Sequence, residues 1–295
     1  MTSSTITASA AGTWRLGAFT VNRLGFGAMR LPFGTLGGAE RDRDVAVAVL
    51  RRAVELGVNH LDTAAFYFSP RRSSNELINR ALAPYADDLV ITTKVGPGRG
   101  PDGAWLPQAT PEGLRGQVEE NIRQLGVEHL DVVNLRIGEA LDRGAGSLAD
   151  RFGALAELRE QGLIRELGIS NVGPEHLAEA LAIAPVVCVQ NQYGLGTRRE
   201  DDALIALCAE HGIAFVPFFA IASGDQASTA DEVVAEVAAA HGATPAQVRL
   251  AWTLHKGPNV LAIPGTGDLN HLEQNVAAGA LRLSVDELAR LDTIG

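Results

Sequence analysis

The sequence has little cysteine, a shortage of basic residues and no long apolar run. Of its 295 residues only 2 are cysteines, and 25 lysines and arginines face 35 aspartates and glutamates, for a net charge of −10. Cys188 and Cys208 lack metal-ligand spacing, which argues against a disulfide framework or a bound metal and predicts two small buried side chains. The acidic balance, without a basic stripe, argues against nucleic acid as a partner.

Targeting and membrane signals are also missing from the sequence. No apolar run approaches the roughly 18 residues that span a bilayer, and residues 1–12 lack the basic and apolar parts of a signal peptide. We therefore expect a soluble cytoplasmic protein that does not bind membranes. Residues 1–12 should form a disordered tail and residues 13–295 a single domain, whose oligomeric state the sequence does not indicate.

The sequence does contain a strict alternation of short apolar runs with segments of helical periodicity. Strands are predicted over residues 24–28, 59–62, 89–94, 131–135, 167–170, 187–191, 214–218 and 260–263. Helices are predicted over residues 42–56, 73–82, 110–125, 148–161, 174–184, 200–211, 231–240, 244–255 and 269–277, with a last one over 284–291. Ser73 and Glu76 fit a capping box at one helix start.

Eight strand–helix units without a linker predict a parallel sheet closed into one (β/α)8 TIM barrel. Residues 14–21 predict a β-hairpin that caps the N-terminal end of the barrel. An open doubly wound sheet is the alternative. Such a sheet would usually show GxGxxG after its first strand, and Gly25-Phe26-Gly27 lacks the third glycine.

Polar or aromatic residues end most of the predicted strands, where TIM barrels carry their chemistry. They are Asp62, Lys94, Arg136, Ser170, Asn171, Gln190, Phe218 and Thr266. A lysine that ends a buried run must be paired or neutral, and Asp62 on the adjacent strand is the natural partner of Lys94. Tyr67 follows on the same loop as Asp62, and a phenol beside a cation gives up its proton readily, which makes Tyr67 a candidate general acid.

For each of these residues a structural alternative stays open. Lys94 could form a salt bridge at the rim without further function, and Tyr67 could be an ordinary loop residue. Phe218 offers a flat ring for stacking, but a core aromatic is the alternative. Ser170, Asn171 and Gln190 have the donors and acceptors that a carboxamide-bearing ligand requires.

Together these motifs resemble those of the aldo-keto reductase family. The motifs are Leu61-Asp62-Thr63-Ala64 with Tyr67, Thr93-Lys94, Gly168-Ile169-Ser170-Asn171, Gln190 with Tyr193, and Ile263-Pro264-Gly265-Thr266 followed by Asn275. The resemblance extends from about Leu24 to Leu291. It implies a TIM barrel that binds NADPH across its mouth and reduces a small aldehyde or ketone, and therefore an NADP-dependent oxidoreductase.

The resemblance also implies roles for individual residues. Tyr67 would donate a proton to the carbonyl oxygen, Lys94 would assist it, and Asp62 would orient Lys94. The nicotinamide would be bound by Ser170, Asn171 and Gln190 and stacked by Phe218. The residues implied for the rest of the cofactor are Ile221 and Gly224 near the pyrophosphate and Gly265, Thr266, His271, Gln274 and Asn275 around the adenosine end.

Two positions depart from the family pattern. Arg136 ends the fourth strand where the family usually has a histidine, and a permanent cation there favours substrates that carry an oxygen anion. The string around Arg136, residues 134–138, resembles a bacterial subgroup related to pyridoxal reductases, so a vitamin B6 aldehyde is a candidate substrate. At the 2′-phosphate site, Gly265 and His271 stand where relatives often have Lys and Arg. We still expect NADPH, with NADH tolerated more than usual.

The substrate pocket and two rival functions remain as hypotheses. Trp105 could be an apolar wall of the pocket, or a solvent-exposed loop residue. The chain ends soon after the last predicted helix, so we expect the pocket to be open. One rival function is a Schiff-base aldolase with Lys94 as nucleophile. The other is an NADPH-binding sensor that turns over slowly.

Overall fold

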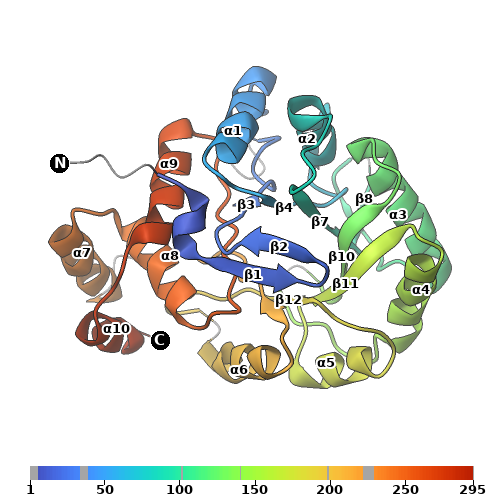
Figure 1. Ribbon diagram of the computed structural model, residues 1–295. Helices are drawn as coiled ribbons and strands as arrows, with labels where there is room; N and C mark the ends of the chain where they lie inside the picture. The colour runs from blue at the N-terminus through green and yellow to red at the C-terminus, as the bar shows by residue number, and fades with distance from the viewer. Residues whose placement is uncertain are drawn as a thin grey trace.

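The computed structural model describes residues 6–33, 39–100, 102–139, 141–197, 199–221 and 229–294. In this part of the chain a ring of parallel strands lies inside a ring of helices (Figure 1). The strands of the sheet, in order around the ring, are β3 (Phe26–Gly27), β4 (His60–Asp62), β7 (Val90–Val95), β10 (Leu130–Arg136), β11 (Ile164–Ser170), β12 (Cys188–Gln190) and β13 (Ala214–Phe215).

Residues 259–264 close this ring in the place of the expected eighth strand. Val260 pairs with Phe215 of β13, and Ala262 pairs with Leu24 just before β3, both in parallel orientation. These pairs are isolated bridges and not a continuous strand, but backbone hydrogen bonds join the segment to both of its neighbours. The predicted single TIM barrel is therefore confirmed, with a seam at residues 259–264.

Helices surround the strands, and several of them begin directly after a polar capping residue. The helices are α1 (Arg43–Glu55), α2 (Ser74–Leu82), α3 (Pro111–Leu125), α4 (Ala149–Glu160), α5 (Pro174–Leu181), α6 (Asp202–Glu210), α7 (Thr229–His241), α8 (Pro245–His255), α9 (Leu269–Ala277) and α10 (Val285–Asp292). The side chains of Asp42, Ser73 and Thr110 accept hydrogen bonds from N–H groups in the first turns of α1, α2 and α3. Because a cap is a local interaction, these helix starts agree with the predicted ones.

Part of the expected disordered tail is ordered. Ala8–Ala11 form a 3₁₀ turn, η1, whose first residue is fully buried. The N–H of Ala8 donates to the carbonyl of Leu56 at 2.8 Å, which ties the turn to the end of α1. The expectation of disorder is wrong for this turn because it finds both a hydrogen-bond partner and an apolar contact. Residues 1–5 lie outside the described residues.

Two other predicted elements differ from the observed ones. The strand predicted over 214–218 ends at Phe215, since Phe218 makes only an isolated bridge with Gln192. The helix predicted to begin at residue 200 begins instead with a 3₁₀ turn, η2 (Arg199–Asp201), that leads into α6. Both differences lie beside the mouth of the barrel, where tertiary contacts override local propensity.

An antiparallel hairpin closes the N-terminal end of the barrel, as predicted (Figure 1). It consists of β1 (Thr13–Leu16) and β2 (Phe19–Asn22). Leu16 and Val21 are fully buried and pack against apolar side chains of the barrel strands. The carboxylate of Glu166, on β11, accepts a hydrogen bond of 2.8 Å from the N–H of Ala18 at the hairpin turn. The hairpin is thus anchored as a floor under the barrel.

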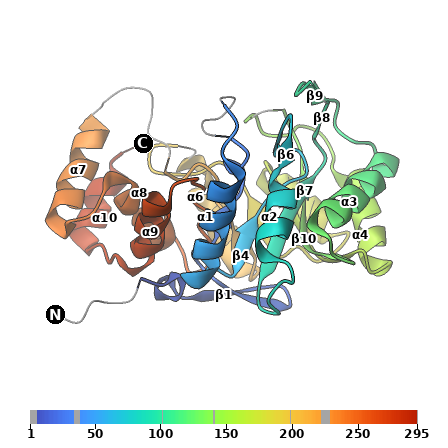
Figure 2. The ribbon, with the colours of Figure 1, turned by 90° about the horizontal axis from the view of Figure 1, so that it is seen from above.

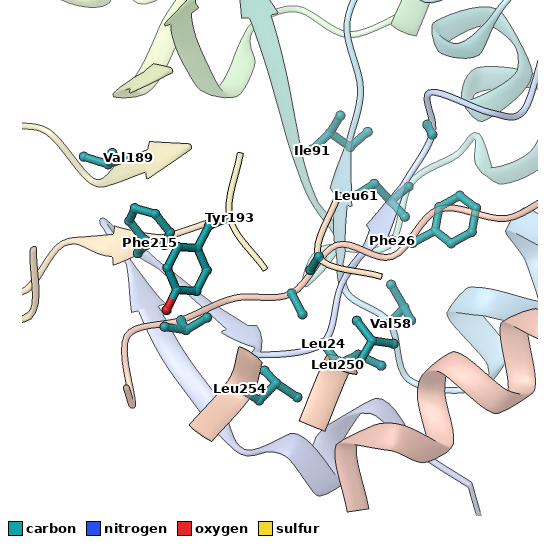
Figure 3. Packing of buried hydrophobic residues seen from close by; sticks show 14 of the residues in the cluster. Leu24, Phe26, Val58, Leu61, Ile91, Val189, Tyr193, Phe215, Leu250 and Leu254 are labelled. Carbon is teal, nitrogen blue, oxygen red and sulfur yellow. The ribbon is translucent and has the colours of Figure 1, made fainter. Parts of the chain in front are cut away.

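A second apolar layer fills the space between the strands and the helices. Figure 3 shows Leu24, at the seam of the ring, close to Leu250 and Leu254 of α8, and all three belong to the main buried cluster. Each fully buried aliphatic side chain contributes about 1.5–3 kcal/mol. This layer holds the strands in register, so that the positions of their carboxyl ends are fixed.

Two short hairpins stand at the opposite end, the mouth of the barrel (Figure 2). They are formed by β5 (Phe68–Ser69) with β6 (Arg72–Ser73) and by β8 (Gly98–Arg99) with β9 (Trp105–Leu106). They lie in the loops that follow β4 and β7, so the carboxyl ends of the strands open on this side. In a TIM barrel this is the end that carries the active site.

The described ranges contain neither a membrane-spanning helix nor a cluster of metal-binding side chains. None of the helices there is both long enough and apolar enough to cross a membrane. Those ranges also contain no group of three or more His, Cys, Asp and Glu side chains placed to hold a metal ion. Cys188 and Cys208 are buried thiols, which confirms their predicted packing role.

His60 lies in the barrel interior below the mouth. Its side chain is fully buried, Nε2 lies 3.1 Å from the hydroxyl of Thr92, and Nδ1 has no hydrogen-bond partner in the described structure. Burial lowers the pKa of His60 to about 4, with Asp62 raising it and Lys94 lowering it by smaller amounts. The imidazole is therefore neutral at neutral pH.

This burial predicts a pH dependence of stability. Between pH 6.5 and about 4 the unfolded chain binds a proton at His60 that the folded chain does not, so stability falls as the pH falls through this window. The full loss is about 3 kcal/mol. We expect His60→Gln to flatten the change of unfolding free energy with pH, measured by urea denaturation, whereas the exposed His211→Gln should keep the wild-type slope. An unchanged slope in His60→Gln would contradict the assignment.

Candidate active site

A buried ion pair joins the ends of the adjacent strands β4 and β7. The Lys94 and Asp62 side chains are 3% and 4% exposed, and Nζ lies 2.5 Å from Oδ1. Nζ also donates to the carbonyl of Thr63 at 3.1 Å. Burial alone would lower the pKa of Lys94, but the charge of Asp62, aided by Tyr67, outweighs it and raises that pKa. Lys94 is therefore held as an ammonium ion.

Tyr67 lies beside this ion pair, in the turn between β4 and α2. Its ring centroid is 5.1 Å from Lys94 Nζ. The turn is fixed by two backbone hydrogen bonds, from the Tyr67 N–H to the Ala64 carbonyl at 3.0 Å and from the Ser74 N–H to the Tyr67 carbonyl at 2.8 Å. The ring of Phe66 packs edge-on against Tyr67 with centroids 5.1 Å apart. A phenol is thus held next to a cation at the mouth.

Arg136, at the end of β10, brings a second cation to the mouth. Its Nη1 lies 3.4 Å from the Ser170 hydroxyl, and its Cζ lies 5.2 Å from the centroid of the Phe218 ring. Burial lowers the pKa of Arg136, while Tyr67 and Asp62 act to raise it. Because a guanidinium titrates far above neutral pH, Arg136 stays charged. Arg136 therefore links Ser170 and Phe218 to Asp62 and Tyr67, within whose electrostatic reach it lies.

Gln190, at the end of β12, completes the surroundings of Asp62. Its Nε2 donates to Asp62 Oδ2 at 2.7 Å, so each carboxylate oxygen of Asp62 has a partner. The other amide atom, Oε1, is buried without a hydrogen-bond partner in the described structure. A buried acceptor left unsatisfied costs about 1–3 kcal/mol, and a ligand with an N–H group would remove that cost. The carboxamide of a nicotinamide has such a group, so these residues fit that cofactor.

Asn171 follows β11 and uses its amide nitrogen to shape the mouth. Nδ2 donates to the carbonyls of Ile137, at 3.0 Å, and Asp142. The residue has a left-handed backbone (φ 66°), which asparagine tolerates better than most residues. Because the amide N–H groups are engaged within the protein, only Oδ1 of Asn171 is left to meet a ligand. Ser170, its neighbour, is fully buried.

A buried hydrogen-bond network supports the ion pair from the side of the helices. The Thr63 hydroxyl donates to Asn75 Oδ1 at 2.7 Å, and Asn75 Nδ2 donates to Asn121 Oδ1 at 2.9 Å. Asn121 Oδ1 also accepts from the Thr93 hydroxyl at 2.6 Å. The network ties β4 and β7 to α2 and α3. Sequence reasoning missed Asn75 and Asn121, although a polar residue on the apolar face of a helix would have been a signal.

Trp105 lies on the β8–β9 hairpin and is 60% exposed. Its ring centroid is 5.8 Å from that of Phe66, and the guanidinium of Arg99 lies 5.6 Å from it. Through Phe66, Trp105 is connected to Tyr67 and to the mouth. Trp105 is therefore a largely exposed loop residue near the mouth, and its role as an apolar wall of the pocket stays a prediction.

The residues expected at the far end of the cofactor lie on two segments, with Ile221 after β13 and the others after the seam. Among them, Thr266 and Asn275 are buried, Gly265 and Ile221 are half-buried, and His271 and Gln274 are exposed. At Gly265 the chain passes so close to β3 that a Cβ atom would lie 2.5 Å from the carbonyl oxygen of Gly27. Gly224 lies outside the described residues.

Comparison with known proteins agrees with this arrangement. A pyridoxine 4-dehydrogenase of Escherichia coli (strain K12) is 48% identical over 96% of this chain and 98% of its own length. A solved thermostable aldo-keto reductase in complex with the inhibitor epalrestat has a TM-score of 0.81 at 30% identity and covers 96% of this chain and 99% of its own. An aldo/keto reductase from Klebsiella pneumoniae, solved with NADP and acetate, has a TM-score of 0.77 at 27% identity over 93% and 91% of the two chains.

The model of the aldo/keto reductase family matches residues 23–295, nearly all of the barrel described above. The match begins at the seam, just before β3, and includes each strand end that contributes to the mouth. The chain therefore belongs to the aldo/keto reductase family of NAD(P)-dependent oxidoreductases.

Proposed function

We propose that this protein reduces an aldehyde to a primary alcohol with NADPH, and that Tyr67 is the general acid. The observation that carries the proposal is the buried Lys94–Asp62 pair beside Tyr67, with Nζ 5.1 Å from the phenol ring. A paired, permanently charged ammonium at that place stabilises a phenolate, and stabilising the phenolate makes proton transfer from Tyr67 easier.

Each residue then has one task in the reaction. When bound, a reduced nicotinamide supplies the hydride that adds to the carbonyl carbon. Tyr67 donates its phenolic proton to the carbonyl oxygen as negative charge develops there, and Lys94 stabilises the phenolate that remains. Gln190, through its buried Oε1, accepts from the carboxamide of the cofactor and so orients it. Tyr67 regains a proton from solvent after the alcohol has formed.

Arg136 supports a substrate with an oxygen anion. Its guanidinium lies at the end of β10, next to the Phe218 ring and within the electrostatic reach of Tyr67. A 3-hydroxypyridine-4-carbaldehyde such as pyridoxal places an ionisable oxygen beside its carbonyl group, where Arg136 could bind both. The 48% identical relative carries the name pyridoxine 4-dehydrogenase. Pyridoxine is the alcohol that corresponds to pyridoxal, so the oxidation of pyridoxine is the reverse of the aldehyde reduction proposed for this chain.

Two rival functions are less well supported. A Schiff-base aldolase needs a neutral lysine as nucleophile, whereas Asp62 raises the pKa of Lys94. A sensor protein would bind NADPH but turn over slowly. A panel of aldehydes and ketones that includes pyridoxal separates the reductase from the sensor, when the oxidation of NADPH is followed by nicotinamide absorbance. Tight NADPH binding without oxidation by any carbonyl would contradict the proposed reductase and favour the sensor.

The role of Tyr67 predicts a selective loss of turnover. We expect Tyr67→Phe to lower kcat by about 10²–10⁴-fold, because general acid catalysis typically contributes this much. Binding of NADPH, measured by fluorescence titration, should stay unchanged. Tyr85→Phe is the matched control, since the Tyr85 hydroxyl donates to the Leu125 carbonyl away from the mouth. If Tyr67→Phe turned over at the wild-type rate, another residue would have to supply the proton.

The role of Arg136 predicts a change in substrate preference. We expect Arg136→Ala to lower kcat/KM for pyridoxal by about 10- to 100-fold more than for pyridine-4-carbaldehyde, which lacks the ionisable oxygen, because hydrogen bonds to charged groups contribute about 1.5–3 kcal/mol. Arg136→Lys should restore part of the preference. Equal losses for the two aldehydes would show that Arg136 acts on the carbonyl group alone, and an unchanged rate would exclude both roles.

A further inference from the structure

Arg41, in the loop before α1, lies against the chain just beyond the seam of the barrel. Its Nη1 donates to the carbonyl of Gly267 at 2.9 Å. A Cβ atom on Gly267 would lie 1.8 Å from Arg41 Cζ, so the guanidinium occupies the space that any other residue at position 267 would fill. Two segments more than 200 residues apart in sequence thus meet through one glycine and one arginine.

The loop that carries Arg41 is fixed on both sides. The Arg41 N–H donates to the Pro32 carbonyl at 3.1 Å, and the Arg72 guanidinium donates to the Arg41 carbonyl. The next residue, Asp42, caps α1. These contacts fix the backbone of Arg41, and the hydrogen bond to Gly267 fixes the position of its guanidinium. A preorganised guanidinium loses less entropy when it binds an anion.

The surroundings of Gly267 are polar and suited to an oxyanion. The Thr266 hydroxyl lies one residue away and accepts from the Asp268 N–H at 3.1 Å, and His271 stands in the first turn of α9. A nearby carboxylate, that of Asp268, caps α9 by accepting from the His271 N–H at 2.9 Å. Hydrogen bonds from that N–H, and then the charges of His271 and Arg41, lower the pKa of Asp268.

We infer that Arg41 supplies the cation for the 2′-phosphate of NADPH that residues 264–271 lack. This inference rests on the proposed function. The family resemblance implies a lysine at the position of Gly265 and an arginine at that of the exposed His271. Here the guanidinium of Arg41, from another loop, lies against Gly267, which stands between these two positions in the sequence. An arginine binds a phosphate monoester with two parallel N–H groups, which a histidine cannot do. Arg41 is thus a specificity residue for NADPH over NADH.

The test measures binding without turnover. We expect Arg41→Ala to weaken NADPH binding by about 10- to 100-fold and to leave NADH binding unchanged. Calorimetry with adenosine 2′,5′-bisphosphate should show the same loss, and adenosine 5′-monophosphate should show none. Gly267→Ala, which displaces the guanidinium without removing it, should reproduce the selective loss, and Arg41→Lys should retain part of the wild-type preference.

Arg43→Ala is the matched control. Arg43 is two residues away and pairs with Asp44 at the surface, so its loss should change neither affinity. If Arg41→Ala weakened NADPH and NADH equally, or weakened neither, the inference would be wrong while the proposed reductase function stood. If the wild-type protein bound neither dinucleotide, the proposed function and this inference would both be overturned.

Discussion

The structure of the mouth depends on keeping Lys94 charged inside the barrel. Removing an ammonium ion from water costs several kcal/mol unless a counter-charge and further acceptors replace the lost hydration. Asp62 at 2.5 Å and the Thr63 carbonyl at 3.1 Å provide these, and both lie at the end of the adjacent strand. The pair can form only if β4 and β7 keep their register, and the Asn75–Asn121 network behind them holds that register from two helices. Tyr67 and Gln190 then take their positions from the same two charged groups.

The features that could be predicted from the sequence are those with local causes. Helix starts followed from capping side chains such as Asp42 and Ser73, and the barrel followed from the alternation of apolar runs with helical periodicity. The strand-end residues followed because parallel strands of a barrel present their carboxyl ends on one side. For these reasons Asp62, Lys94 and Arg136 could be placed together before any contact was known.

The features that could not be predicted depend on which loops become neighbours. Nothing near Gly267 in the sequence indicates that Arg41 will lie on it, and nothing near Asn171 indicates that its amide nitrogen will bind the loop after β10. The early end of β13 at Phe215 has the same origin, since the chain there leaves the sheet to pair with residues after β12. Long-range contacts of this kind form when the ring of strands closes, so they depend on the whole fold and not on the residues near each position in the sequence.

The folded protein gathers several cations near the mouth of the barrel although its net charge is negative. A chain with a net charge of −10 repels an anionic ligand on average. Lys94 and Arg136 lie at the strand ends, and Arg41 lies against Gly267 just beyond the seam, where the proposed dinucleotide would extend. Since fields from exposed charges are screened within about 8–10 Å, these nearby cations count for more in binding than the distant acidic surface.

The sealed floor of the barrel determines how protons and products move. Below Lys94 the interior is filled by His60 and Thr92, and below those by the buried Leu16 and Val21 of the hairpin. On that side the described residues surround the ammonium group with packed, buried side chains. In the proposed reaction, the proton that replaces the one given up by Tyr67 would enter through the mouth by which the alcohol departs, so reprotonation and product exit would share one passage.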